Sequence, residues 1–358
     1  DNIMGKAKRR NLYKTKNSNF VNITREEALN MVIEACNTNR ITDEIKDLIL
    51  LFGFGAEDLL EGGAKSSSVS TVANYINEFC TDGKLEYVIV THAHQDHYAG
   101  FATGENMDSI FDLFECGTII DFAQTNQKPT ATLFKNYQRE LADEVAAGAH
   151  HYTAAQCYNQ TDGAQRTYDL STEVELEILY NPYYFTKFGS GENNHSVCCM
   201  INSGEHKFLF TGDLEKEGEA ELASHYKTDH GVTSVEVDLY KAGHHGSKTS
   251  SSEAFLATFK PHICCVCCCA GSPEYTKTAA NQFPTQQFVD NISVYTAEVY
   301  VTSLCIDYDK NEFTSFNGNI IVALKDEEIL VSCSNNNTKL KDSDWFKQNR
   351  ICPTVWAS

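Results

Sequence analysis

The feature that most constrains the fold of this chain is a set of six short apolar runs. Each run ends in a polar, glycine-rich or histidine-rich turn. The runs lie at residues 87–90, 175–180, 196–201, 207–212, 235–240 and 263–269. Their length and their β-branched or aromatic content predict strands. Segments with helical periodicity lie before or between them, at residues 67–80, 106–115, 130–148 and 216–226. Strands interleaved with helices indicate a layered α/β architecture.

The two ends of the chain differ from this pattern. Residues 1–63 are predicted to form a small helical appendage: Thr24 and Glu27 make a capping box, and residues 42–54 and 55–63 suggest two further helices. We therefore expect a helical N-terminal segment at 1–63 and one large domain at 64–358. Residues 297–334 predict a β-meander with polar turns.

The composition is that of a soluble globular protein. Of 358 residues, 42% are hydrophobic and 22% are charged. No apolar run reaches the 18 residues or so of a membrane span, and the first ten residues do not resemble a secretion signal, so no membrane association is expected.

Fourteen cysteines are present, five of them at 264–269 and two at 198–199. Neighbouring strand residues point to opposite faces, so such clusters do not suit a disulfide framework. A zinc ribbon would need a second Cys pair on turns, and none is well placed. We interpret the cysteines as small buried hydrophobic residues, and their free thiols predict a cytoplasmic location.

The formal net charge of −20 argues against a broad nucleic-acid surface. A polyanionic substrate would need a local positive site, either bound metal or a basic patch. The dense basic run at residues 6–16 is either a solvated tail or a contact for phosphate or an acidic partner.

Metal-ligand residues are concentrated in "THAHQDHYAG", residues 91–100, directly after an apolar run. His92, His94, Asp96 and His97 occupy four of six consecutive positions. Two imidazoles at i and i+2 can face one metal ion, while Asp96 and His97 can turn toward a second one. Nitrogen and carboxylate ligands favour zinc, with manganese or iron as alternatives.

Two later strand ends offer the remaining ligands. "KFLFTGD" ends in Asp213, whose carboxylate could bridge two cations, and "YKAGHHGS" carries His244, His245 and Ser247. Loops that follow strands on a rigid scaffold are where sites are usually built.

These motifs resemble the metallo-β-lactamase superfamily and, within it, the hydrolase domain of ComEC-type DNA-uptake proteins. The similar stretches are "THAHQDHYAG" (91–100), "GENNHSVCCMI" (191–201), "FLFTGDLEKEGEAEL" (208–222), "YKAGHHGSKTSS" (240–251), "CCCAGSPEY" (267–275) and "QFPTQQFV" (282–289). The resemblance covers residues 64–330. It implies an αββα metallo-β-lactamase sandwich with two divalent metal ions at one edge of the sheets.

The resemblance also implies roles for single residues. His92 and His94 would bind the first metal; Asp96, His97 and His245 would bind the second; and Asp213 would bridge them. His244 would then face the substrate as a phosphate contact or proton donor, although the order within the histidine pair stays open. Ser247 and Lys248, with Lys241, Thr249 and Ser250, could bind phosphate oxygens or form a capped helix start.

Two features depart from the superfamily pattern. His195 could be a third ligand of the first metal, but an exposed loop histidine is the alternative. Relatives begin with two or three strands, for which the segment before His92 looks too short, so the first sheet is either abbreviated or lacks a stretch of chain near residue 63.

The sequence therefore predicts a dinuclear metal-dependent hydrolase, a phosphodiesterase or nuclease in which a metal-bridging hydroxide attacks a nucleic acid or small nucleotide. One alternative is hydrolysis of a lactone, β-lactam or thioester. Another is a regulatory module whose N-terminal helices bind a protein partner.

Overall fold

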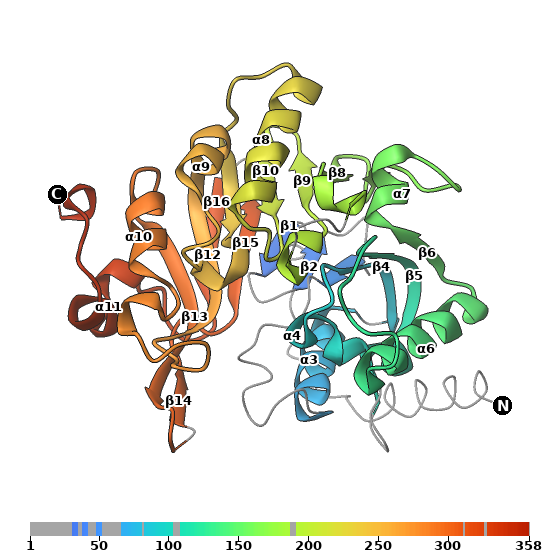
Figure 1. The fold of residues 1–358 in the computed structure, drawn as a ribbon, viewed down its shortest axis with the longest axis horizontal. Coiled ribbons are helices and arrows are strands. Elements are labelled where there is room, and N and C mark those ends of the chain that lie inside the picture. The colour runs from blue at the N-terminus through green and yellow to red at the C-terminus, as the bar shows by residue number, and fades with distance from the viewer. Residues whose placement is uncertain are drawn as a thin grey trace.

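The computed structural model describes residues 31–34, 38–41, 48–51, 66–80, 82–102, 108–186, 191–310, 312–325 and 328–357. It shows the α/β architecture that the sequence predicts, with several sheets and helices packed on them (Figure 1). Each of the six apolar runs named above contributes to a strand.

The largest sheet has eight strands in the order β14-β13-β12-β11-β10-β9-β8-β7. Their bounds are β7 Thr167–Asp169, β8 Val174–Ile178, β9 Cys199–Ser203, β10 His206–Phe210, β11 Val237–Lys241, β12 Pro261–Ala270, β13 Glu298–Asp307 and β14 Glu312–Ser315. Strands β10 to β13 pair in parallel. Their carboxyl ends therefore share one sheet edge, where ligand sites of α/β sheets usually form.

Two smaller sheets complete the β structure. One is parallel and contains β4 Lys84–Val90, β5 Glu115–Asp121 and β6 His150–Thr153. The other has the order β16-β15-β1-β2-β3, with bounds β1 Met31–Glu34, β2 Thr38–Ile41, β3 Leu48–Leu51, β15 Ile320–Lys325 and β16 Glu328–Cys333. Strand β3 lies against β4, so the two smaller sheets adjoin.

The helical prediction for residues 1–63 is wrong where the structure describes this segment, because β1, β2 and β3 lie there. Four-residue segments are too short to show either period clearly, and pairing with distant strands decides between them. Met31 pairs with Leu324, and Glu34 pairs with Ile321. These strands add to the β structure before His92, where the sequence predicted an abbreviated sheet or a missing stretch near residue 63. The rest of 1–63, including residues 52–63, lies outside the described residues, so the boundary at residue 63 and the partner-docking role stay predictions.

Side chains alternate between two cores across the large sheet. Phe208 and Phe210 of β10 join a core that also contains Ile120 of β5 and Val322 of β15, whereas Leu209 joins a second core with the helices on the other face. A third core lies between β4, β5 and their helices. The helices are α3 Ser66–Phe79, α4 Gln95–Tyr98, α5 Ile110–Leu113, α6 Thr132–Ala147, α7 Ala154–Asn159, α8 Lys216–His230, α9 Glu253–Phe259, α10 Gln286–Ser293 and α11 Asp344–Asn349.

The cysteines behave as the sequence predicts. Every cysteine in the described part of the chain is free, and those of β9 and β12 are buried. Cys265 and Cys267 face the core between the sheets, and Cys264 and Cys268 face the helices. They therefore serve as small apolar side chains of a central strand.

The predicted C-terminal meander is only half correct. Strands β13 and β14 form an antiparallel hairpin, but the next two strands belong to a different sheet. Strand β15 pairs with β1 and buries Ile320 and Val322 between the sheets. No helix in the described ranges has the length and hydropathy of a membrane span.

Candidate metal centre

The histidine-rich turn follows the buried strand β4 and runs directly into the short helix α4. The hydroxyl of Thr91 lies 3.2 Å from Nδ1 of His92 and 3.3 Å from Nδ1 of His97. A hydroxyl that contacts both Nδ1 atoms leaves both Nε2 atoms directed the other way. Outer contacts of this kind orient metal-binding imidazoles.

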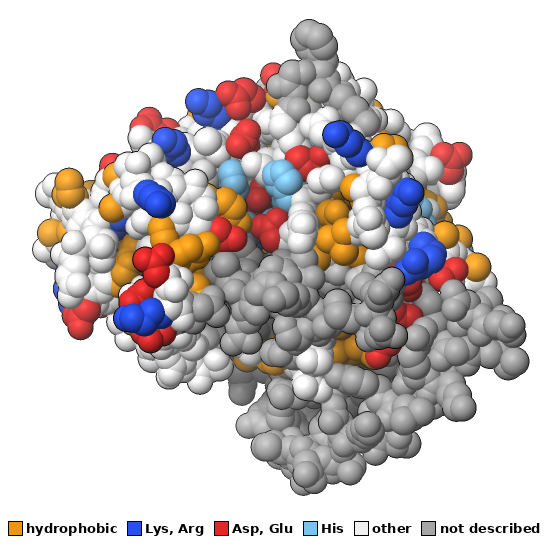
Figure 2. All heavy atoms as spheres, turned by 60° about the horizontal axis from the view of Figure 1, so that its bottom comes forward, with side chains coloured by type: hydrophobic (Ala, Val, Ile, Leu, Met, Phe, Trp, Pro, Cys, Tyr) orange, Lys and Arg blue, Asp and Glu red, His pale blue; other side chains and the backbone are white. Residues whose placement is uncertain are grey.

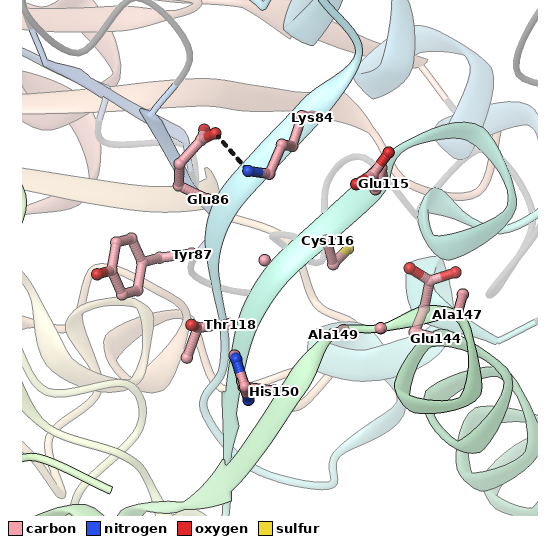
Figure 3. A pocket seen from close by; sticks show the side chains of 12 residues that line it. Lys84, Glu86, Tyr87, Glu115, Cys116, Thr118, Glu144, Ala147, Ala149 and His150 are labelled. Atoms are coloured by element: carbon pink, nitrogen blue, oxygen red, sulfur yellow. Dashed lines mark ion pairs between the residues drawn. The ribbon is translucent and has the colours of Figure 1, made fainter. Parts of the chain in front are cut away.

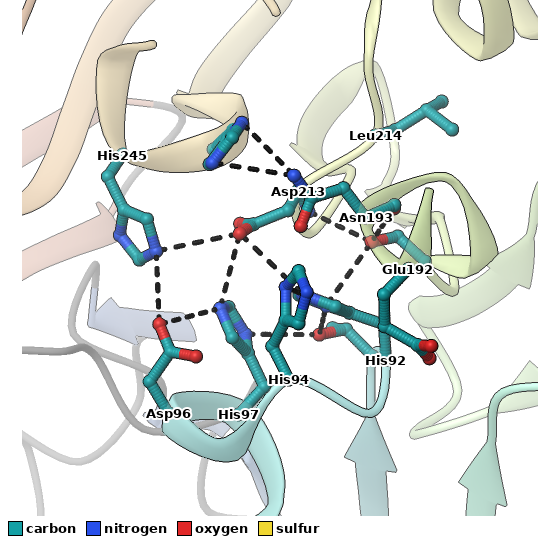
Figure 4. Close-up of polar contacts among 12 residues, drawn as sticks. His92, His94, Asp96, His97, Glu192, Asn193, Asp213, Leu214 and His245 are labelled. Atoms are coloured by element: carbon teal, nitrogen blue, oxygen red, sulfur yellow. Dashed lines mark hydrogen bonds and ion pairs between the residues drawn. The ribbon is translucent and has the colours of Figure 1, made fainter. Parts of the chain in front are cut away.

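Side chains from three separate turns converge on one point (Figure 4). Oδ2 of Asp213 lies 3.7 Å from Nε2 of His92, 3.4 Å from Nε2 of His97 and 3.6 Å from Nε2 of His245. Oδ2 of Asp96 lies 3.6 Å from Nε2 of His97 and 3.8 Å from that of His245. Two potential ligand groups result among the described residues: His92, His97 and Asp213; and Asp96, His97 and His245.

His94 borders the first group. Its Nδ1 atom lies 3.1 Å from Nε2 of His92, so ring nitrogens of both histidines face the same space. This separation, like the carboxylate distances above, exceeds a metal–ligand bond of about 2 Å. One cation between the two imidazoles would bond both nitrogens.

The chemistry of the donor set fits divalent metal ions. Nε2 of His97, Nε2 of His245 and Oδ1 of Asp213 are buried without a hydrogen-bond partner among the described residues. A buried polar atom without a partner costs about 1–3 kcal/mol, so three at one point call for a ligand. Imidazole nitrogens and carboxylate oxygens are the usual ligands of zinc.

The ionisation states suit the same role. Burial opposes the charge on Asp213, yet the neighbouring His97 and His245 outweigh it and hold the pKa of this carboxyl well below its ordinary value. Burial lowers the pKa of His92, and it lowers the pKa of His245 to about 4. Burial also disfavours the charge on His97, but Asp213 and Asp96 raise its pKa overall. Ionised Asp213 and neutral His92 and His245 are the forms that bind metal.

A strained turn presents the two histidines that follow β11. His244 (φ 46°, ψ 49°) and His245 (φ 54°, ψ 26°) both occupy the left-handed region, which non-glycine residues rarely adopt. Nδ1 of His245 lies 2.7 Å from the main-chain oxygen of Cys267 in β12. Nδ1 therefore carries the hydrogen, and the lone pair of Nε2 faces Asp213 and Asp96.

The glycine after this pair is required by close packing. Gly246 has φ 76°, and a Cβ atom there would lie 2.8 Å from Cβ of Pro284. The amide of Thr285 donates to the carbonyl of Gly246 at 2.9 Å. These contacts fix the turn against residues 271–285, which we call the rim loop.

The structure separates the two histidines by environment. His245 is buried among the candidate ligands, whereas His244 belongs to neither ligand group and is partly exposed. Nδ1 of His244 lies 3.1 Å from the hydroxyl of Thr249, 3.4 Å from Nδ2 of Asn193 and 3.8 Å from Oε1 of Glu215. His244 thus stands beside the cluster, held by polar neighbours.

The two predicted substrate contacts already have partners. The hydroxyl of Ser247 lies 3.1 Å from that of Thr249, within the same turn. The ammonium of Lys248 donates to Asn281 of the rim loop at 3.0 Å and is exposed. Lys248 therefore joins the turn to the rim loop, while Ser247 stabilises the turn.

His195 does not join the candidate ligands, and the alternative of an exposed loop histidine is wrong. Its side chain is fully buried, and Nδ1 lies 3.4 Å from the main-chain oxygen of Tyr183. The segment Glu192–His195 is a 3₁₀ turn that packs beside the turn Pro182–Tyr184. This packing directs His195 into the protein.

Three residues that the sequence reasoning did not single out support the cluster. The hydroxyl of Ser196 contacts the amide of Asp213 at 3.0 Å and Nδ1 of His92 at 3.4 Å. Glu192 accepts from the amides of Ala93 (3.3 Å) and Asn126 (2.6 Å). Asn193 reaches toward His244, and its Oδ1 is buried without a partner among the described residues. The "GENNHSV" motif was the available signal for all three.

A separate pocket of about 380 Å³ lies elsewhere on the parallel three-stranded sheet (Figure 3). It is lined by the amino-terminal parts of β4 and β5, the start of β6 and the end of α6, including Lys84, Glu86 and His150. The candidate ligands follow the opposite end of β4, and none of them lines this pocket.

Comparisons with known proteins give short or loose likenesses, and no family profile matches the chain. Over 72 residues the chain is 36% identical to ComE operon protein 3 of Bacillus subtilis (strain 168) and 35% identical to Recombination protein 2 of Haemophilus influenzae. Each match covers 20% of this chain and 8% of the relative's length.

Among solved structures, the diiron β-hydroxylase CmlA from Streptomyces venezuelae aligns over 76% of this chain and 44% of its own, with 13% identity and a TM-score of 0.32. A CmlA β-hydroxylase mutant gives 12% identity and a TM-score of 0.35, over 52% of its chain. None of these likenesses defines the family of the whole chain.

Proposed function

We propose that the protein is a dinuclear metal-dependent phosphodiesterase with a metallo-β-lactamase αββα sandwich. The layers support this fold, because the sheets share one core and carry helices on their outer faces. The observation that carries the function is the convergence of three imidazole Nε2 atoms and two carboxylates from three turns, with unpartnered buried atoms among them.

The proposed ligand assignment follows the distances. His92 and His94 would hold the first cation, and Asp96, His97 and His245 would hold the second. Asp213 would contact both, since its Oδ2 lies within 3.4–3.7 Å of three imidazoles. Two bound divalent cations supply charge neutralisation at the phosphoryl group and a hydroxide nucleophile at neutral pH.

The remaining chemistry would come from the protein's own side chains. His244 stands beside the metal ligands and is partly exposed, so we propose that it donates a proton to the leaving oxygen or contacts phosphate. Thr249 and Asn193 hold its ring in place. The ammonium of Lys248 would attract nonbridging oxygens from the rim.

Two observations support a phosphodiester over a carbonyl substrate. The short stretch of 36% identity belongs to a ComE operon protein, in keeping with the motif resemblance to DNA-uptake proteins. His195, which would provide the third histidine of lactone and thioester hydrolases, belongs to neither ligand group among the described residues.

The surface favours a short substrate. Figure 2 shows histidines in a hollow with acidic and hydrophobic side chains around them, while the lysines and arginines of the described residues stand singly on this face. With a net charge of −20, such a surface gives little hold on a long duplex. We therefore propose small nucleotides or single strands as substrates.

The test is cleavage by protein stripped of metal and reloaded with zinc or manganese. Single-stranded DNA, duplex DNA, RNA and bis(p-nitrophenyl) phosphate are the substrates. Asp213→Ala should lose activity, and Asp309→Ala, which removes an exposed turn carboxylate, should keep it. Failure of the metal-replete protein on all four substrates would refute the proposal. Equal rates with Asp213→Ala would assign the activity to a contaminant.

A further inference from the structure

An aromatic path runs from the candidate metal centre to the surface through the rim loop. The ring of Phe283 lies 6.0 Å from that of His245, nearly parallel at 27°, and 5.6 Å from that of His244. The ring of Tyr275 lies 5.3 Å from that of Phe283. One intermediate ring therefore separates Tyr275 from a candidate metal ligand.

The outer member of this path is an exposed aromatic ring. Tyr275 is 57% exposed, whereas Phe283 packs against the core under the helices. A half-exposed tyrosine on a partly buried phenylalanine provides a flat surface at a fixed place. Such surfaces bind planar rings, and stacking of a base on an aromatic side chain is worth about 1–3 kcal/mol.

The rim loop is anchored at both ends. The amide of Gly271 donates to the carbonyl of Phe283 at 2.9 Å, which closes the loop. Arg350, which directly follows α11, donates to the carbonyls of Pro284 (2.8 Å) and Gln282 (2.6 Å). Because these contacts fix the backbone of the loop, the aromatic surface is formed before any ligand arrives, which lowers the entropy cost of binding.

Charged residues lie in the rim loop and against it. Glu274 directly precedes Tyr275, and burial and the charge of Asp96 raise the pKa of its carboxyl. Lys248 reaches the same loop through Asn281. The ring contact of Phe283 with His245 and the hydrogen bond of Lys248 to Asn281 therefore both join this loop to the turn that carries a candidate ligand.

From this arrangement we infer that Tyr275, backed by Phe283, is a stacking platform for a nucleobase attached to the scissile phosphate. The inference rests on the proposed phosphodiesterase function and narrows its substrate to base-bearing phosphodiesters. Sugar and phosphate alone would bind the metal centre without this contact.

The experiment compares substrates that differ only in the base. Hydrolysis of a thymidine dinucleotide and of its abasic tetrahydrofuran counterpart is followed by chromatography with metal-loaded full chain. The readout is the ratio of the two kcat/KM values. We expect Tyr275→Ala to lower this ratio about five- to a hundredfold, and Tyr275→Phe to retain it within about twofold. Tyr308→Ala removes an exposed tyrosine on the β13–β14 turn and should leave the ratio unchanged.

Calorimetry gives a second readout that does not require cleavage. Thymidine 5′-phosphate should bind more tightly than deoxyribose 5-phosphate, and Tyr275→Ala should remove most of the difference. If Tyr275→Ala keeps the wild-type preference for the base-bearing compound, in kinetics or in binding, Tyr275 is not the stacking platform. Absence of hydrolysis of both dinucleotides, with base-dependent binding intact, would instead refute the proposed reaction.

Discussion

The hydroxyl of Ser196 accepts a hydrogen bond from the amide of Asp213 at 3.0 Å. It donates its own hydrogen to the carbonyl of Asn193 at 2.7 Å. With that hydrogen used, its contact with Nδ1 of His92 at 3.4 Å requires the imidazole to be the donor. The lone pair of His92 is then on Nε2, which faces Asp213. One serine thus links the tautomer of a candidate ligand to the backbone of another.

Removing this hydroxyl should weaken metal binding. Ser196→Ala loses the contacts to Asp213 and His92, and outer contacts of this kind change metal affinity about 10–100-fold. Competition with a chromophoric chelator measures the dissociation constant. Ser293→Ala, which removes a serine hydroxyl bonded within α10, is the control and should bind metal normally. Equal affinities of both variants and the wild type would contradict the role of Ser196.

Replacing the candidate bridging carboxylate should remove metal and activity together. Asp213→Asn keeps the shape of the side chain but loses the charge that His97 and His245 face. We expect a loss of at least one metal equivalent by elemental analysis and a fall of at least about a hundredfold in phosphodiesterase kcat. Full metal content with unchanged rate would exclude Asp213 as a ligand.

Gly212, directly before Asp213, should tolerate no side chain. It has φ 54°, and a Cβ atom would lie 2.8 Å from Oγ of Ser196 and 3.1 Å from Cβ of Thr91. Gly204→Ala is a matched control, because Gly204 has φ 57° with nothing within 4 Å. Backbone strain alone costs about 1–2 kcal/mol. We expect Gly212→Ala to lower the free energy of unfolding by more than Gly204→Ala does, and only Gly212→Ala to impair metal binding.

The buried carboxyl of Glu219 should make stability depend on pH. Burial raises its pKa to about 7, although the amides of Ser251 (2.6 Å) and Ser252 (2.9 Å) donate to it. The folded pKa exceeds the unfolded value of 4.5. The protonated form therefore contributes stability that is complete below about pH 4.5 and is lost as the pH rises through about 7.

Between pH 6 and 8 the stability of the wild type relative to Glu219→Gln should fall by about 1 kcal/mol, since each pKa unit is worth about 1.4 kcal/mol. Chemical denaturation of metal-free protein at each pH measures this difference. A difference that stays constant over this range would show that Glu219 does not titrate there.

The sequence predicted the elements whose signal is local. The apolar run before His92 has the length and composition of a buried strand, and four candidate ligands within six positions indicated a metal-binding turn after it. Strand β1 could not be predicted in the same way, because the pairing of Met31 with Leu324 joins positions at opposite ends of the chain. A four-residue apolar run carries too few turns of any period to decide alone.

The motif "GENNHSV" marked the segment of the supporting residues, but their contacts could not be predicted from it. Ser196 and Glu192 are single polar residues in a loop, and only the folded chain brings them to Asp213 and Ala93. The same holds for the rim loop, whose aromatic residues have no periodic pattern. Buried position and hydrogen bonding of a loop residue depend on tertiary packing, which local sequence does not encode.

The hydrogen bonds of Arg350 to the carbonyls of Gln282 and Pro284 link the proposed base platform to a part of the chain outside the candidate metal centre. Trp345 of α11 also packs closely against the start of the rim loop. A Cβ atom on Gly271 would lie 2.6 Å from the indole nitrogen of Trp345. Substitutions in α11 are therefore expected to alter base recognition by the proposed platform while the candidate metal ligands stay in place. Residues that position the proposed base platform and residues that form the candidate metal centre can therefore change independently of each other.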